Sequence, residues 1–473
     1  NAFALDLDWS GDDVSVSDNP TKDSWNPRLA VDVNGEAHVV YNDNHSNGLQ
    51  KIMYRKRNVI GNWSDAIFVD AGGEIGGRNN HFPSIAASPN GDLHVTYNVW
   101  AFENIRNYVG YSHYNAATDT WSDGVKISDL NGTVNHTRGR HAVYSTDANL
   151  PVVVWGYDYR ENQVNEEIYM KYFDGTDWSS DLPVSELSDG FDAGLPHIES
   201  MGGGKAMIVF SEKIAGNTAE LRYRIYDETT HALSDIKTLP LTNVTGLRYT
   251  LLSDANGDMK VLTLHSETGP VRASFSVYNY DAGTDLFTMA FNTEIDAFAG
   301  NSKEIDMDCN SDNDCGIVYT DFIAENNMFM EYNDADGFAT PLMINQQNPA
   351  FDTPSCEFDA AGHLHVVWND KRFDDGQGFD EREVIYERAV NNNLGVTNFD
   401  SATIEVYPNP SNGIININTV DSFTLEIYDV LGRTIDRKTI TGNTTINSLV
   451  TSGTYFLRFT NETATVVKKV IVN

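Results

Sequence analysis

Hydrophobic and polar residues alternate in short runs along the first part of the chain, with the period of two that is typical of half-buried β-strands. One pattern recurs: an alternating run, a turn of Asp, Asn or Gly, and a Val-rich run. It occurs seven times, and the second runs end 49 to 58 residues apart, at Tyr41, Tyr97, Trp155, Phe210, Thr263, Tyr319 and Trp368. Self-similarity at this period indicates a repeat architecture.

Each unit continues with a third strand-like run, such as KIMYRKR from Lys51, and then with a short strand that opens on Trp-Ser, as at Trp63. Seven units of four antiparallel strands predict an all-β fold, a seven-bladed β-propeller. The seventh unit has only three runs, whereas a lone Trp-Ser-type string, WSGDDVSVSDN, starts at Trp9. We therefore expect residues 12–18 to pair antiparallel with residues 384–390, so that the N-terminal strand closes the last blade and leaves no free sheet edge.

The pattern changes after residue 390. Residues 391–403 are polar and read as a linker, and residues 404–473 contain short alternating strands separated by Pro and Gly turns. This predicts a small Ig-like β-sandwich as a second domain, after a propeller that spans residues 1–390.

Composition narrows the function classes. The chain of 473 residues carries 68 acidic and 32 basic residues, a net charge of −36, which argues against nucleic acid as a partner. No hydrophobic run approaches the ~20 residues that span a bilayer. The chain begins at Asn1 rather than Met, as expected after removal of an export signal, and equally of a trimmed chain.

Recurring residues are discounted as candidates for chemistry. His38, His94 and His365 each stand in Gly-x-x-His-Val on the second strand of a unit, so we assign them to blade packing. The turn Asn333–Gly337 (NDADG) matches only part of a calcium loop; an ordinary turn is favoured and Ca²⁺ is the alternative. No cofactor is required by any motif in the sequence.

Irregular polar and aromatic residues remain in the loops on one face of the predicted ring. Aromatic rings suit the apolar faces of sugars, while Arg and His suit their carboxylates or sulfates. These residues predict that the propeller binds an extracellular, acidic glycan or acts as an adhesin; the alternative is that they only satisfy loop carbonyls. They are Trp25, Asn80, Trp100, His136, Arg138, Arg140, Tyr157, His197, Arg248 and Tyr249.

An enzyme is the alternative function. Residues 9–390 resemble propellers of the sialidase-like type in architecture and repeat style, and some such propellers that act on acidic polysaccharides are lyases. The Ser-x-Asp-x-Gly-x-Thr-Trp turns of sialidases are missing from the sequence, which argues against that activity. A polysaccharide lyase performing β-elimination on a uronate-containing polysaccharide such as ulvan needs a charge neutraliser and a base. Its candidate residues are Tyr144, His81, His141 and Arg160. A surface scaffold for a protein partner is the third hypothesis.

The C-terminal segment carries a more specific resemblance. The strings YPNPSNG, IYDVLGR, SGTYFLRF and KKVIVN resemble, in order, the C-terminal sorting domain of type IX secretion cargo from Bacteroidota. The motif residues are Tyr407, Pro408, Asn409, Pro410, Gly413, Asp429, Gly432, Arg433, Gly453, Tyr455, Lys468 and Lys469. The resemblance implies export through periplasm and outer membrane to the cell surface or beyond, with the type IX translocon, its outer-membrane shuttle barrel and a sortase as partners. A carbohydrate-binding appendage is the alternative.

Two further features fit an exported protein. Cys309 and Cys315 flank the turn NSDND in a cross-strand position and could form a disulfide in an oxidising periplasm, leaving Cys356 reduced. Asp400-Ser401-Ala402 resembles the Bacteroidota O-glycosylation motif, with Ser401 as the acceptor.

Overall fold

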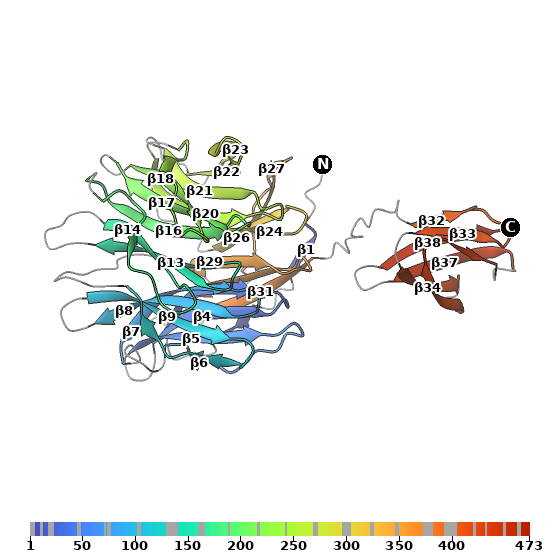
Figure 1. Ribbon diagram of the computed structural model, residues 1–473, viewed down its shortest axis with the longest axis horizontal. Coiled ribbons are helices and arrows are strands. Elements are labelled where there is room, and N and C mark those ends of the chain that lie inside the picture. The colour runs from blue at the N-terminus through green and yellow to red at the C-terminus, as the bar shows by residue number, and fades with distance from the viewer. Residues whose placement is uncertain are drawn as a thin grey trace. The chain divides into compact units, whose positions relative to one another are not determined.

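The chain forms two compact units, Asn1–Asn392 and Asn393–Asn473, each described here by itself. The computed structural model describes residues 5–9, 13–17, 23–44, 49–70, 72, 77–101, 106–128, 141–158, 166–187, 190–214, 218–241, 244–267, 273–295, 304–321, 326–345, 350–371, 382–391, 404–419, 422–430, 433–447, 451–460 and 465–473. Those residues form strands and turns, and none of them lies in a helix (Figure 1). Within the same ranges, no helix long and apolar enough to cross a membrane occurs.

Antiparallel sheets built from consecutive strands make up the first unit. The first three sheets contain β3 (Ser24–Val31), β4 (Ala37–Asn44), β5 (Gln50–Arg57) and β6 (Ile67–Phe68); β7 (Asn79–Ala87), β8 (Leu93–Ala101), β9 (Arg106–Asn115), β10 (Thr120–Trp121) and β11 (Val125–Lys126); and β12 (His141–Ser145), β13 (Pro151–Asp158), β14 (Glu166–Tyr172) and β15 (Leu182–Pro183).

The next repeats follow the same order. One sheet joins β16 (Ala193–Ser200), β17 (Lys205–Lys213), β18 (Ala219–Asp227) and β19 (Lys237–Thr238) to β20 (Val244–Ser253), β21 (Met259–Glu267), β22 (Ala273–Asp281) and β23 (Leu286–Ile295). A single residue pair, Ala219 with Val244, links its two halves. Another sheet holds β24 (Ile305–Cys309), β25 (Cys315–Asp321), β26 (Asn326–Asn333), β27 (Gly337–Phe338) and β28 (Leu342–Met343).

The N-terminal strands join the last repeat. β29 (Ala350–Phe358), β30 (Leu364–Asp370) and β31 (Glu383–Asn391) form a sheet in which β31 also pairs antiparallel with β1 (Leu7–Trp9) and β2 (Val14–Ser15). The register places Val14 opposite Tyr386 and Ser15 opposite Ile385. Segments more than 360 residues apart in sequence therefore share one sheet.

A hydrogen-bond pattern that recurs in another repeat identifies the role of this N-terminal segment. The Ser17 hydroxyl accepts the Val384 backbone N–H at 2.9 Å and donates to the buried Glu383 carboxylate at 2.6 Å. In the third repeat, Ser185 accepts the Ile168 N–H at 2.8 Å and donates to Glu167 at 2.6 Å. The N-terminal segment thus occupies, on β31, the place that a fourth strand occupies within other units.

Hairpin turns between the first and second strands explain why the sequence pattern recurs. Asp32 accepts the backbone N–H groups of Asn34 and Glu36, both at 2.9 Å, and Asp254, Asn310 and Asp359 form the same turn. Such side-chain-to-backbone bonds favour turns over continued strand. Gly35 adopts a φ of 77°, a conformation that glycine reaches without a steric penalty.

Recurring histidines have a structural role. His38, His94 and His365 are buried, and their Nδ1 atoms lie 2.7–2.8 Å from the hydroxyls of Tyr54, Tyr111 and Tyr386 on the neighbouring third strands. Each pair fills the same place in its sheet.

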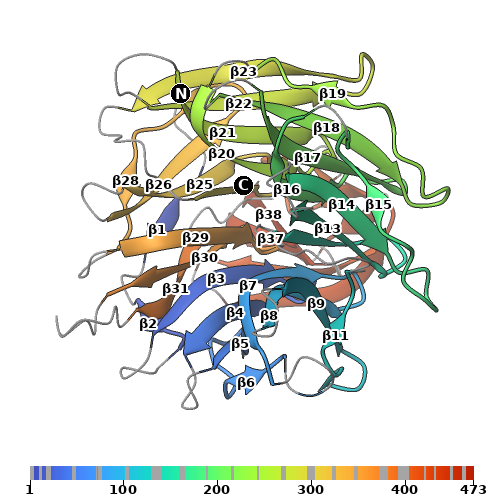
Figure 2. The same cartoon turned by 90° about the vertical axis from the view of Figure 1, so that its left-hand side faces the viewer.

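First strands of successive repeats contact one another in cyclic order. β3 contacts β7, and the series continues through β12, β16, β20, β24 and β29, which contacts β3 again. Figure 2 shows the sheets following one another around a common centre in chain order. Large buried side chains such as Trp155, Trp368 and Phe210 fill the spaces within and between sheets.

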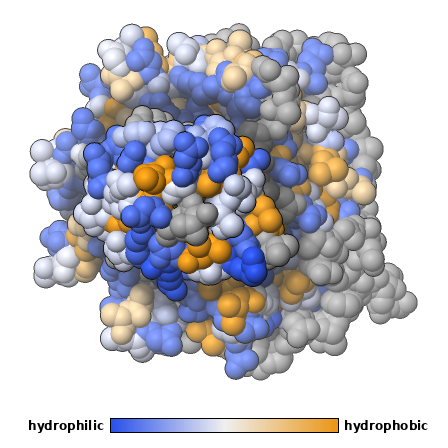
Figure 3. Space-filling view, turned by 90° about the vertical axis from the view of Figure 1, so that its right-hand side faces the viewer, coloured by the Kyte–Doolittle hydropathy of each residue, from blue (hydrophilic) through white to orange (hydrophobic). Residues whose placement is uncertain are grey.

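The second unit is a two-sheet sandwich. One sheet contains β32 (Ile404–Tyr407), β33 (Ile415–Thr419) and β36 (Thr444–Ile446); the other contains β35 (Thr434–Thr441), β34 (Ser422–Asp429), β37 (Gly453–Thr460) and β38 (Thr465–Val472). Ile417, Leu425, Leu457 and Val470 from both sheets share one buried cluster. On the face shown in Figure 3, hydrophobic side chains are scattered among hydrophilic ones.

Cys309 and Cys315 face each other across β24 and β25 and form a disulfide, with their Cα atoms 4.0 Å apart. Cys356 is a buried free thiol, and burial raises its pKa.

Candidate functional site

A cavity of about 540 Å³ lies where the first strands of the repeats meet. Alternate residues of a strand face the same side, so each strand presents residues at two levels of the cavity. The level four residues before each hairpin turn is formed by Arg28, Ser84, Ala142, His197, Thr250, Asp306 and Ser355. The level two residues before the turn is formed by Ala30, Ala86, Tyr144, Glu199, Leu252, Asp308 and Glu357.

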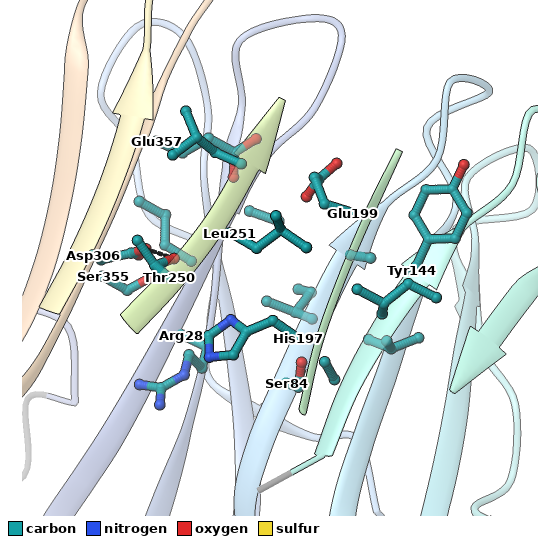
Figure 4. A pocket seen from close by; sticks show the side chains of 18 of the residues that line it. Arg28, Ser84, Tyr144, His197, Glu199, Thr250, Leu251, Asp306, Ser355 and Glu357 are labelled. Atoms are coloured by element: carbon teal, nitrogen blue, oxygen red, sulfur yellow. Dashed lines mark hydrogen bonds between the residues drawn. The ribbon is translucent and has the colours of Figure 1, made fainter. Parts of the chain in front are cut away.

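The two levels differ in charge. Figure 4 shows Arg28, Ser84 and His197 toward one end of the cavity, and Glu199, Glu357 and Tyr144 toward the other. We call the end with Arg28 and His197 the mouth and the end with Glu199 and Glu357 the acidic level.

Cations at the mouth are held by nearby oxygens. Arg28 forms an ion pair with Glu304 at 2.6 Å and donates to the Pro27 carbonyl at 2.8 Å. Arg248 donates to the Leu247 carbonyl at 2.8 Å. The His197 ring lies 4.9 Å from that of Tyr249, whose hydroxyl donates to the Leu195 carbonyl. The mouth is therefore a preorganised polar rim.

Carboxyl groups that line the cavity have raised pKa values. Burial raises the pKa of Glu199 and of Asp308 to about 7, and that of Glu357 well above its usual range. Nearby carboxylates add to each shift, because like charges oppose ionisation. Burial also raises the pKa of Asp306, which accepts hydrogen bonds from Thr250 Oγ1 at 3.2 Å and from the Cys356 N–H at 3.0 Å. With pKa values of about 7, Glu199 and Asp308 are partly protonated at neutral pH, where exposed carboxyl groups are ionised.

A repeated bulge shapes the mouth. The pairing of the first and second strands shifts register before Arg28, Ser84, His197 and Ser355, and residues two positions earlier have positive φ values. These residues are Asn26 (φ 50°), Phe82 (φ 53°), Leu195 (φ 54°) and Thr353 (φ 55°).

Of the residues expected to serve a lyase, Tyr144 and His141 line the cavity, whereas His81 is not among its described lining residues. The Tyr144 hydroxyl donates to Glu228 at 2.7 Å, and burial raises its pKa. His141 Nδ1 lies 2.8 Å from Thr96 Oγ1, and burial lowers its pKa to about 3. His81 is also buried, and its pKa is lowered to about 4. Arg160 lies outside the described residues.

Only part of the expected binding set borders the cavity. His197, Arg248 and Tyr249 line it. Trp25 is instead buried, with the Arg382 guanidinium 5.0 Å from its ring centre. Asn80 is fully buried and donates to Asp70. Trp100 and Tyr157 belong to β8 and β13, but their side chains lie outside the described residues, as do His136, Arg138 and Arg140 entirely.

The structure also places residues at the cavity that the sequence analysis did not select. Phe82, Arg28 and the acidic level are the main ones. The sequence contains a signal for the acidic residues, since Glu199, Asp308 and Glu357 occupy the same repeat position on predicted first strands.

One group among the described residues has metal-ligand chemistry: Asp32, Glu36 and His38. All three already have partners, since Asp32 caps its turn, Glu36 pairs with Lys56 at 2.9 Å and His38 lies beside Tyr54. In the turn Asn333–Gly337, Asn333 accepts two backbone N–H groups and Asp334 pairs with Lys260 at 2.7 Å, as in an ordinary turn.

Several motif residues of the second unit form hydrogen bonds or ion pairs within it. Asn409 donates to the Lys469 carbonyl at 2.7 Å and accepts the Ile471 N–H at 2.9 Å, which ties the YPNPSNG segment to β38. Arg433 forms an ion pair with Asp429 at 2.6 Å, and the Tyr455 hydroxyl donates to the Thr451 carbonyl at 2.9 Å. Gly432 and Ser401 lie outside the described residues.

Residues 405–473 match the family described as "Secretion system C-terminal sorting domain". The second unit is a type IX sorting domain. Such a domain exports its cargo through the type IX secretion system to the cell surface or the extracellular space, so the secretion system is a partner of this chain. No curated protein matches the chain.

Solved structures resemble the first unit at low identity. A protein of unknown function from Dyadobacter fermentans is 11% identical, with a TM-score of 0.49 over 81% of this chain and 98% of that one. The polysaccharide lyase Uly1 is 12% identical, with a TM-score of 0.49 over 77% and 89%. A GH93 α-L-arabinofuranosidase of Fusarium graminearum is 11% identical, with a TM-score of 0.45 over 81% and 98%. At these TM-scores the likenesses carry no argument about function.

Proposed function

We propose that the first unit is a seven-bladed β-propeller, closed by its N-terminal strand, that binds an extracellular glycan at the cell surface. The cyclic contacts from β3 through β29 support the ring, and the pairing of β2 with β31 supports its closure. Export by the sorting domain supports an extracellular ligand.

The observation that carries the binding proposal is the polar cavity. Its volume of about 540 Å³ is in the range of small-ligand sites, and its mouth presents Arg28, His197 and Arg248 with the hydroxyl groups of Ser84 and Ser355. Sugars offer many hydroxyl groups to such donors and acceptors. Carboxyl groups do not attract anions, so anionic groups of a glycan would bind the cations at the mouth.

Binding is favoured over β-elimination by the surroundings of the candidate base. A lyase base must reach the proton beside the uronate carboxylate. The Tyr144 hydroxyl instead donates a hydrogen bond to Glu228, and burial raises its pKa. His81 is buried and is not among the described residues that line the cavity, and Nδ1 of the buried His141 lies 2.8 Å from Thr96 Oγ1.

Affinity electrophoresis of the full chain in polygalacturonate, alginate, ulvan, laminarin and xylan tests the proposal. We expect retardation by at least one polysaccharide and no rise in the ultraviolet absorbance of unsaturated products. Arg248→Ala should weaken binding about tenfold, the value of one charge-assisted hydrogen bond. The control is Arg437→Ala, an exposed arginine of the sorting domain.

Three results would contradict this function. Retardation in no gel would favour a scaffold for a protein partner, and equal losses in both arginine variants would point to unspecific charge attraction. A steady absorbance rise that Tyr144→Phe abolishes would establish the lyase.

A further inference from the structure

Phe82 is an exposed aromatic residue at the mouth of the cavity. The residue is 51% exposed, although it lies within β7 among the residues that line the cavity. Exposed large aromatic side chains at a concave site are typical of binding surfaces.

Packing does not explain an aromatic residue here. The equivalent positions of other repeats hold Asn26, Leu195 and Thr353, with φ values within a few degrees of that of Phe82. The bulge therefore forms with side chains of different size and polarity. The positive φ recurs in several repeats, whereas the phenyl ring is particular to the second repeat.

The backbone of Phe82 is fixed while its ring stays exposed. Its N–H donates to Oδ1 of the fully buried Asn42 at 2.9 Å. Its carbonyl group faces His141, where it partly opposes the lowering of that pKa by burial. A ring on such an anchored backbone loses little conformational entropy when a ligand covers it.

A neutral imidazole lies beside the ring. Among the described residues, His81 is its aromatic neighbour, with ring centres 6.1 Å apart and the planes tilted by 38°. Because burial lowers the pKa of His81 to about 4, this imidazole is neutral at physiological pH. On the same strand, Ser84 adds a hydroxyl group at the mouth.

We propose that Phe82 is the stacking platform of the glycan site and takes the C–H face of one pyranose ring. This inference rests on the proposed glycan binding and adds that the contact at Phe82 is apolar and insensitive to salt. Ser84 and His197 line the same cavity and would bind hydroxyl groups of the same saccharide. The sugar unit on Phe82 is then selected by its uncharged face, and the cations select the neighbouring units.

Substitutions at Phe82 separate ring stacking from bulk apolar contact. Phe82→Leu keeps an apolar side chain that the fold accepts, since Leu195 occupies the equivalent bulge. Phe82→Tyr keeps the ring. The matched control is Ile60→Ala, which removes an exposed apolar side chain (78%) from the turn between β5 and β6.

Affinities are measured for the full chain on whichever of the five polysaccharides the unaltered protein binds most tightly, at 0.05 M and 0.5 M NaCl. We expect Phe82→Leu to weaken binding about tenfold at both salt concentrations and Phe82→Tyr to retain it. The loss for Arg248→Ala should shrink at high salt, because screening weakens charge contacts. Unfolding midpoints of the Phe82 variants should match the parent, because the side chain is half exposed.

The outcomes are distinguishable. If the unaltered protein binds none of the polysaccharides, the proposed function fails and this inference fails with it. If the unaltered protein binds and Phe82→Leu binds equally well, only the stacking platform is overturned. An equal loss in Ile60→Ala, or a Phe82 loss that disappears at high salt, would also overturn it.

Discussion

Individual carboxyl groups in the cavity make the stability of the fold depend on pH. Glu199 and Asp308 have pKa values raised to about 7 by burial, whereas the same groups titrate near pH 4 in an unfolded chain. Between these values the folded chain holds protons that the unfolded chain has released. Stability therefore falls as pH rises through this interval, because the unfolded state binds fewer protons.

Replacing Glu199 by Gln removes one of these groups without changing its shape. We expect Glu199→Gln to raise the free energy of unfolding by about 1–2 kcal/mol at pH 8 and to change it little at pH 4, where the carboxyl is protonated in both states. Urea unfolding at half-unit steps from pH 4 to pH 8 measures the difference. The exposed Glu186→Gln serves as the control, and equal midpoints for parent and Glu199→Gln at pH 8 would contradict the expectation.

The repeat pattern in the sequence indicates which residues differ between repeats, but not which of them are buried in the folded chain. The sequence analysis selected His197, Arg248 and Tyr249 because they break the repeat pattern at the entrance to first strands, and all three line the cavity. It could not find the burial of His81 and His141, which depends on contacts between neighbouring sheets, such as that of His141 with Thr96. Phe82 was not predicted as a binding residue, because the exposure of its ring depends on the folded bulge and not on its position in the repeat.

Strands show a closer agreement between sequence and structure. Alternation and turn residues predicted an all-β chain and the pairing of the N-terminal segment with β31, because both depend on local patterns and on one missing strand. The second N-terminal strand, β1, which pairs Leu7–Trp9 with residues 389–391, was not expected. Its three residues are too few to produce a recognisable period.

The two hydrogen bonds of Ser17 allow the contribution of the N-terminal segment to stability to be measured. We expect Ser17→Ala to lower the free energy of unfolding by about 1–3 kcal/mol, because it leaves the buried Glu383 carboxylate and the Val384 N–H without this partner. Ser185→Ala, which removes the same pair of bonds within one continuous repeat, is the matched comparison. Closure would be doubtful if only Ser185→Ala destabilised the chain in chemical denaturation.

At the scale of the whole molecule, folding and export are assigned to separate units. The first unit has its own buried clusters, and the sorting domain has a core formed by its own two sheets. Separate cores allow each unit to fold without the other. The sorting function was predicted from motif residues such as Asn409 and Asp429, whose hydrogen bonds and ion pair stabilise the sandwich.

Separate units lead to a prediction about transport. Removal of residues 404–473 should leave a folded first unit that accumulates in the periplasm, because the export signal is lost while the propeller core is intact. Fusion of the same residues to a periplasmic reporter should bring the reporter to the surface. Protease accessibility on whole cells measures both effects. The comparison sample is a reporter fused to a segment carrying Asn409→Ala and Asp429→Ala, because these substitutions loosen the sandwich without removing it. Surface display of the truncated chain at the parent level would show that the first unit carries its own route across the outer membrane.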